Sequence, residues 1–177
     1  LSIGFRAFKD CFGLTSVTIG SGVTSIDLET FKQCIALTSV TIGSGVTSIG
    51  EGVFASCHSL TTVTIPSGVT EIGNGAFKFC RDLLDVFCRA ENVPSIYSDT
   101  FEDSNIANAT LHVPAGSVEA YKAAEQWSQF KEIVALPEPV KGDVDGDGVV
   151  DVNDLVTLVK MIAAGDGSAA GDVNEDG

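Results

Sequence analysis

The chain has 177 residues, 44% of them hydrophobic, and a formal net charge of −14. This length suits one or two domains with a packed core, and the negative charge excludes nucleic acid as a favourable partner because the phosphate backbone would be repelled. No apolar run reaches the roughly 20 residues that a membrane-spanning helix needs, so the sequence predicts no transmembrane segment.

A 23-residue period organises the chain as far as about residue 105. The unit that begins at Leu37 reads Leu-Thr-Ser-Val-Thr-Ile-Gly-Ser-Gly-Val-Thr-Ser-Ile-Gly and continues to Phe54 and Cys57. Units of the same pattern begin 23 residues before and after it. Residues 1–11 match only the back half of a unit, so we expect the chain to be a fragment. A fixed period of this size predicts a solenoid in which each coil contacts only its neighbours.

Each unit contains one short strand with two distinct faces. Val40 and Ile42 are two residues apart and are predicted to point inward, whereas Ser39 and Thr41 point outward. A Gly-Ser-Gly turn follows, and the next apolar groups of the unit return to the interior. Stacking the units about 4.8 Å apart would bury each core residue against its own copy in the neighbouring coil. These predicted core residues are Val46, Ile49 and Phe54 with their repeats.

This pattern resembles the BspA-type leucine-rich repeats of bacterial surface proteins. The matching residues are Leu-x-x-Val-x-Ile-x-x-Gly-Val-x-x-Ile-Gly-x-x-x-Phe-x-x-Cys, three times over. The resemblance implies a leucine-rich-repeat solenoid, mainly β, with short strands along a concave face. It also implies a secreted or cell-surface location in a bacterium.

Four of the five cysteines occupy the same position of successive units: Cys11, Cys34, Cys57 and Cys80. Neighbouring members of this column would lie at a Cα separation that a disulfide tolerates. We favour buried, reduced thiols that act as small apolar fillers. A zinc site is disfavoured because its ligands must converge on one point, whereas these lie along a line. Cys88 replaces an inward isoleucine and is predicted to be core.

The outward strand positions form a candidate ligand-binding face. The alternative is that these residues are simply good solvent-exposed strand formers. Few of them are aromatic, which argues against strong binding hot spots. The candidate residues are Ser16, Thr18, Ser39, Thr41, Thr62, Thr64, Asp85 and Phe87.

The repeat pattern degenerates after Leu83. Val93, Ile96 and Phe101 arrive one residue late, which predicts a one-residue insertion near residues 89–92. A last strand is predicted around Leu111, and Ser117 can cap a short helix after it. An open solenoid end exposes apolar groups and sheet edges, so we expect this helix and the aromatic residues beyond it to close the end. These large residues are Trp127, Phe130 and Ile133.

A proline-containing linker, residues 137–141, separates the solenoid domain, residues 1–136, from an acidic tail, residues 142–177. The tail contains over half of the net charge in under a quarter of the length, which suggests cation binding. Residues 143–154 match the spacing of an EF-hand calcium loop, with Gly148 at the sharp turn and aspartate in place of the usual closing glutamate. The predicted calcium ligands are Asp143, Asp145, Asp147, the Val149 carbonyl, Asp151 and Asp154.

The loop pattern starts again 29 residues later with Asp172, Asn174 and Asp176, and the sequence stops before its remaining ligands. Two calcium loops, the first of them followed by a predicted helix, resemble the dockerin module. This resemblance implies a small α-helical domain that docks onto a cohesin-like scaffold protein. Recognition in that family uses two loop positions that are Val152 and Asn153 here, so the class of cohesin does not follow.

No catalytic constellation appears in the sequence, and we therefore predict a non-enzymatic binding or adhesion protein. Its solenoid would bind an unidentified protein or glycan, and calcium would order the docking module. Two alternatives stay open. The repeats could be a spacer that binds nothing, or the chain could be the non-catalytic part of a larger secreted enzyme with its catalytic domain upstream.

Overall fold

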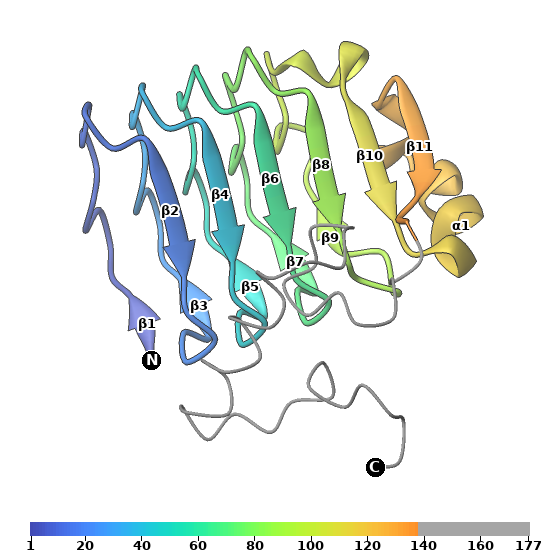
Figure 1. Cartoon of the computed structure of the whole chain (residues 1–177), viewed down its shortest axis with the longest axis horizontal. Helices are drawn as coiled ribbons and strands as arrows, with labels where there is room; N and C mark the ends of the chain where they lie inside the picture. Colours follow the sequence, from blue (N-terminus) through green and yellow to red (C-terminus); the bar gives the residue numbers. More distant parts are fainter. Residues whose placement is uncertain (138–177) are drawn as a thin grey trace, which may run out of the picture. The chain divides into compact units, whose positions relative to one another are not determined.

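The computed structural model describes residues 1–137, and the chain divides after Leu136 into two units, of which the first is described here. Its main element is a six-stranded parallel sheet in the order β11-β10-β8-β6-β4-β2 (Figure 1). The strands are β2 (Ser16–Ile19), β4 (Ser39–Ile42), β6 (Thr62–Ile65), β8 (Asp85–Cys88), β10 (Thr110–Val113) and β11 (Glu132–Ala135).

The predicted two-faced strand is confirmed. In β4, Val40 and Ile42 are buried and Ser39 and Thr41 are exposed. Neighbouring repeat strands pair in register with their own copies, as Val40 with Val63. Side chains of one kind therefore form straight rows across the sheet, because alternate residues of a strand point to opposite faces.

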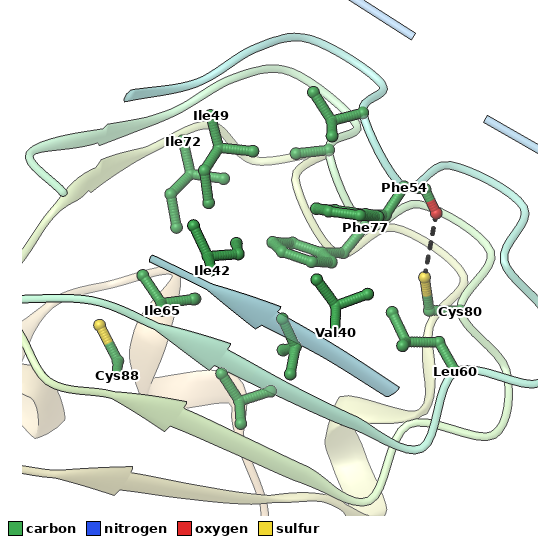
Figure 2. Packing of buried hydrophobic residues seen from close by; sticks show 14 of the residues in the cluster. Val40, Ile42, Ile49, Phe54, Leu60, Ile65, Ile72, Phe77, Cys80 and Cys88 are labelled. Atoms are coloured by element: carbon green, nitrogen blue, oxygen red, sulfur yellow. Dashed lines mark hydrogen bonds between the residues drawn. The ribbon is translucent and has the colours of Figure 1, made fainter. Parts of the chain in front are cut away.

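A second parallel sheet, which the sequence did not predict, runs along the other side of the coils (Figure 1). Its order is β1-β3-β5-β7-β9, and each strand has two residues. One apolar residue of each strand faces the first sheet, as Ile49 faces Ile42 (Figure 2). The strands are β1 (Ser2–Ile3), β3 (Ser25–Ile26), β5 (Ser48–Ile49), β7 (Glu71–Ile72) and β9 (Ser95–Ile96).

A column of stacked phenylalanine rings fills the interior, as predicted. Phe54 is fully buried and lies parallel to Phe31 and Phe77, with 5.4 Å between ring centroids on each side (Figure 2). The column begins at Phe8 and continues to Phe101, with centroid separations of 5.2 and 5.3 Å at its two ends. Each coil therefore buries its central ring between the rings of its neighbours.

The return loops are also hydrogen-bonded from coil to coil. The Phe31 N–H donates to the Val53 carbonyl at 2.9 Å, and equivalent bonds recur along the molecule. Each loop bends through residues with positive φ, and Gly52 and Gly75 take two of these positions at φ 59° and 56°. A Cβ at Gly45 would collide with the Ser21 carbonyl of the coil below, so the coil spacing itself requires glycine there.

The predicted insertion in the fourth unit is confirmed. Ile72 pairs with Ile96, 24 residues on, and Phe101 still stacks on Phe77. The extra residue is absorbed between β8 and β9, and the core contacts resume beyond it.

The C-terminal segment, residues 114–136, corrects two expectations. The strand around Leu111 is not the last, because β11 follows it and pairs parallel to β10. Ser117 does precede α1 (Val118–Ala123), but its hydroxyl donates to the Glu91 carbonyl at 2.7 Å and caps no helix N–H. The fourth coil thus holds the segment through this bond. Three 3-10 helices complete the fold: η1 (Asn105–Asn108), η2 (Ala115–Ser117) and η3 (Trp127–Gln129).

Two large aromatic residues of this segment are buried against the end of the phenylalanine column. Trp127 is 1% exposed, and its indole N–H donates to the Pro94 carbonyl at 3.0 Å. Phe130 packs edge-on against Phe101, with 5.3 Å between centroids. Within residues 1–137, no helix has the length and apolarity needed to cross a bilayer.

Candidate functional site

Two rows of side chains cover the outward face of the six-stranded sheet. The eight residues predicted as a ligand-binding face all lie in these rows, and the register extends the rows by four residues that the sequence analysis missed. One row is Ser16, Ser39, Thr62, Asp85, Thr110 and Glu132; the other is Thr18, Thr41, Thr64, Phe87, His112 and Val134.

The rows change character between β6 and β8. On β2, β4 and β6 every outward residue is serine or threonine, and none of these six hydroxyls hydrogen-bonds another group within residues 1–137. A separate column of threonines just before the strands is structural instead. For example, the Thr61 hydroxyl donates to the Thr38 carbonyl at 3.0 Å. The outward hydroxyls are therefore free to meet solvent or a ligand.

On β8 and β10 the rows contain a compact cluster, which we call the aromatic–acid cluster, made of Asp85, Phe87 and His112. The His112 ring stacks on Phe87 with 4.3 Å between centroids and an interplanar angle of 11°. His112 Nε2 lies 2.8 Å from Asp85 Oδ1. Because an ionised carboxylate only accepts hydrogen bonds, Nε2 is the donor. The side chains of Asp85 and His112 are 41% and 20% exposed, so a ligand can reach the cluster.

His112 was missed because its strand does not follow the 23-residue period: it pairs with Phe87, 25 residues earlier. A lone histidine carries no signal in a single sequence, and only the pairing of Phe87 with His112 across β8 and β10 brings it to the aspartate. The available sequence signal was the alternation Thr-Leu-His-Val in β10, which places the histidine on the polar face once the strand is recognised.

Burial makes three thiols of the cysteine column unreactive. The Cys57 thiol is fully buried and donates to the Phe31 carbonyl at 3.3 Å, and Cys34 and Cys80 make the equivalent bond to the preceding coil. Burial raises the pKa of Cys57 to about 12 and that of Cys34 to about 11, which suppresses the reactive thiolate. All five cysteines are free, and the interpretation as buried fillers holds for Cys34, Cys57 and Cys80. Cys11, in the first coil, is only partly buried.

Cys88 is buried, as predicted, and its sulfur meets the C-terminal segment. Cys88 Sγ lies 3.2 Å from the Tyr121 hydroxyl, which donates to the Ala90 carbonyl at 2.8 Å. The thiol in place of the usual isoleucine therefore accommodates a buried phenol from α1. Burial raises the pKa of both groups.

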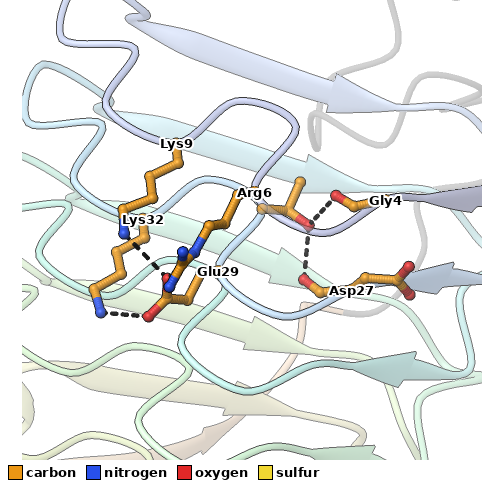
Figure 3. A network of polar contacts seen from close by, with 7 residues as sticks. Gly4, Arg6, Lys9, Asp27, Glu29 and Lys32 are labelled. Atoms are coloured by element: carbon orange, nitrogen blue, oxygen red, sulfur yellow. Dashed lines mark hydrogen bonds and ion pairs between the residues drawn. The ribbon is translucent and has the colours of Figure 1, made fainter.

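A charged network lies on the return loops near the N-terminal end of the solenoid. Three cations surround the Glu29 carboxylate: Arg6 Nε at 2.6 Å, Lys9 Nζ at 3.1 Å and Lys32 Nζ at 2.6 Å (Figure 3). Hydrogen bonding to Lys32, with further bonds from Arg6 and Lys9, lowers the pKa of Glu29 to about 2. The network joins two coils, because Arg6 and Lys9 precede Glu29 and Lys32 by one repeat, and this is a structural role.

The predicted metal and docking residues lie outside the described part of the chain. These are Asp143, Asp145, Asp147, Val149, Asp151, Asp154, Asp172, Asn174 and Asp176 for calcium, and Val152 and Asn153 for the partner. Within residues 1–137, no group of three or more histidine, cysteine, aspartate or glutamate side chains could hold a metal ion.

Two solved structures of leucine-rich repeat proteins are similar to this chain. A leucine rich repeat protein of T. pallidum aligns with a TM-score of 0.61 and 24% identity over 96% of this chain and 78% of its own. A leucine rich cell surface protein of Faecalibacterium prausnitzii aligns with a TM-score of 0.43 and 28% identity over 75% of this chain and 38% of its own. The first of these likenesses supports the fold alone. No curated protein matches the chain.

The family model for the BspA type leucine rich repeat region matches residues 1–122 in six copies. The matched region contains both sheets up to β10, the phenylalanine column and the thiol column described above. Its extent covers more than half of the chain and includes the degenerate fourth unit. The chain therefore belongs to the BspA type leucine rich repeat family.

Proposed function

We propose that this chain is a non-enzymatic surface or secreted protein that binds a protein or glycan ligand through the outward face of its six-stranded sheet. The observation that carries the proposal is the aromatic–acid cluster at the end of two exposed hydroxyl rows. Its residues take no part in the core, and they are placed together only by the pairing of β8 with β10. The family to which the chain belongs supports the surface setting.

The chemistry of the face suits recognition rather than catalysis. His112 is engaged with Asp85 on one side and stacked on Phe87 on the other, so its ring is fixed. The thiols of Cys34, Cys57 and Cys80 are held in the core with raised pKa values. The six free hydroxyls, by contrast, are ordinary hydrogen-bonding groups whose spacing repeats from strand to strand. A fixed ring pair beside regularly spaced hydroxyls offers one anchor and an extended polar surface.

We further propose that the acidic tail binds calcium and docks the protein onto a cohesin-like scaffold. The support for this step is the loop spacing of residues 143–154, which supplies oxygen ligands at the positions that calcium requires. Bound calcium would neutralise the clustered carboxylates and order the loop. We also propose that α1 and the aromatic residues beside it close the C-terminal end of the solenoid.

The test is an array of glycans and of host and microbial surface proteins, probed with the full chain and two variants. Phe87→Ala removes the anchor, and Glu51→Ala is the control because Glu51 is exposed on a return loop, outside the outward face. We expect a ligand whose binding falls at least about tenfold with Phe87→Ala and is unchanged with Glu51→Ala. A chain that binds nothing on the array would support the spacer function instead. A chelator added to the array separates binding by the solenoid from docking by the tail.

A further inference from the structure

A cleft of about 290 Å³ lies away from the outward sheet face, between the last coil and the C-terminal segment. One wall comes from residues 96–106 of the last return loop, and the other comes from Gln126 and Gln129 beside η3. Its size falls near the lower end of small-ligand sites, so it fits one or two sugar rings. Ile96, Phe101 and Ile106 contribute apolar lining, and Phe101 and Ile106 are buried.

Three polar side chains at the cleft are unpaired within residues 1–137. The Asp103 carboxylate and the amides of Gln126 and Gln129 make no side-chain hydrogen bond with other groups of residues 1–137. Glu102 is different, because it already pairs with Lys78. A free carboxylate accepts from hydroxyl groups, and a carboxamide both donates and accepts. The unpaired groups together therefore match a ligand that has many hydroxyls and little charge.

An aromatic ring stands beside these groups. Tyr97 is 47% exposed, and its hydroxyl donates to Glu71 at 3.0 Å, which fixes the ring at the edge of the cleft. A fixed, exposed ring provides an apolar face against which the C–H groups of a sugar can pack. An anionic ligand is disfavoured by the two carboxylates Glu102 and Asp103.

Both walls are held in place without a ligand. The Lys131 N–H donates to the Ile106 carbonyl at 3.0 Å, and Trp127 is tied to Pro94. The Tyr97 N–H donates to the Thr100 hydroxyl at 2.9 Å, which fixes the loop at the other wall. A preformed site loses little conformational freedom on binding. We propose that this cleft binds a neutral saccharide, with Asp103, Gln126 and Gln129 as hydrogen-bonding groups and Tyr97 as the stacking ring.

The test is a titration of the full chain with cellobiose, lactose and N,N′-diacetylchitobiose, followed by ¹H–¹⁵N correlation spectra. At least one of these probes should shift the backbone signal of Asp103 and the side-chain amide signals of Gln126 and Gln129 at millimolar concentration. Asp103→Asn should weaken that binding about tenfold, since it removes the strong acceptor. Asparagine tolerates the left-handed backbone at this position, φ 56°, so the variant keeps the loop conformation.

Two further variants separate the contributions. Tyr97→Phe keeps the ring without its bond to Glu71 and should bind somewhat more weakly, whereas Tyr97→Ala should not bind. Phe87→Ala on the outward face should leave the shifts of the Asp103, Gln126 and Gln129 signals unchanged, which distinguishes this site from the proposed ligand face. Absence of shifts with all three saccharides would overturn the proposal. So would a response of the same signals to calcium chloride alone, because it would assign the cleft to a cation.

Discussion

Replacing Phe54 with alanine tests the column on which the solenoid depends. The ring is fully buried and stacks on two neighbours at 5.4 Å. Phe8 provides an internal comparison, because it is 43% exposed and stacks on one neighbour only. A fully buried phenylalanine costs about 3–5 kcal/mol on truncation to alanine. The half-exposed ring with one stacking partner should cost about 1–2 kcal/mol.

The assay is urea unfolding followed by far-ultraviolet circular dichroism, with Thr41→Ala as a surface control. Phe54→Ala should lower the midpoint most, Phe8→Ala less, and the control least, because Thr41 is exposed on the outward face. The slope of the transition should be unchanged if the coils still unfold together. Equal losses for Phe54→Ala and Phe8→Ala would refute the stacked column as the main source of stability.

Three further predictions concern thiols, charge and calcium. The buried thiols of Cys34, Cys57 and Cys80 should resist a thiol reagent at mildly alkaline pH in the folded protein, and all five cysteines should react in denaturant without reductant; a lower count would indicate disulfides. The pKa of Glu29 is lowered to about 2, so the wild type should have a higher unfolding free energy than Glu29→Gln. This difference should be full above about pH 5 and lost as the pH falls toward 2. A difference that does not change with pH would contradict the ion cluster. Calorimetry should find one tight calcium site per chain, which Asp154→Ala abolishes and for which magnesium competes poorly. A stoichiometry of zero would exclude the calcium loop. Two tight sites would show that the second loop is complete enough to bind.

Sequence periodicity predicted the part of the fold in which every coil repeats its neighbour. The alternation of Val40 and Ile42 with hydroxyl residues defined the strand faces, and the in-phase phenylalanines defined the column. The two-residue strands of the second sheet were not predictable, because two residues contain no alternation to detect. β11 was missed for a related reason, since residues 132–135 lie outside the repeat and form a strand only by pairing with β10.

The candidate site was likewise predictable only where its residues lie in the repeats. Asp85 and Phe87 were predicted because they replace hydroxyl residues at repeat positions. His112 joins them only through the register of β10 with β8, which is long-range information. The cleft beside Tyr97 depends on a contact between the last coil and residues 126–129, and no pattern in either segment indicates the other.

Register between identical coils has a consequence for how such chains change length. Excision of residues 37–59 would join Ala36 to Leu60 and place Phe31 directly on Phe77, with every inward residue meeting the same kind of partner as before. Recombination between gene copies can therefore add or remove whole coils, and no new kind of core contact is needed. Each event lengthens or shortens the outward hydroxyl rows by one step, while the aromatic–acid cluster, built from β8 and β10, keeps its own geometry. The length of the hydroxyl rows and the geometry of the cluster are thus encoded in separate parts of the chain, and they can evolve independently.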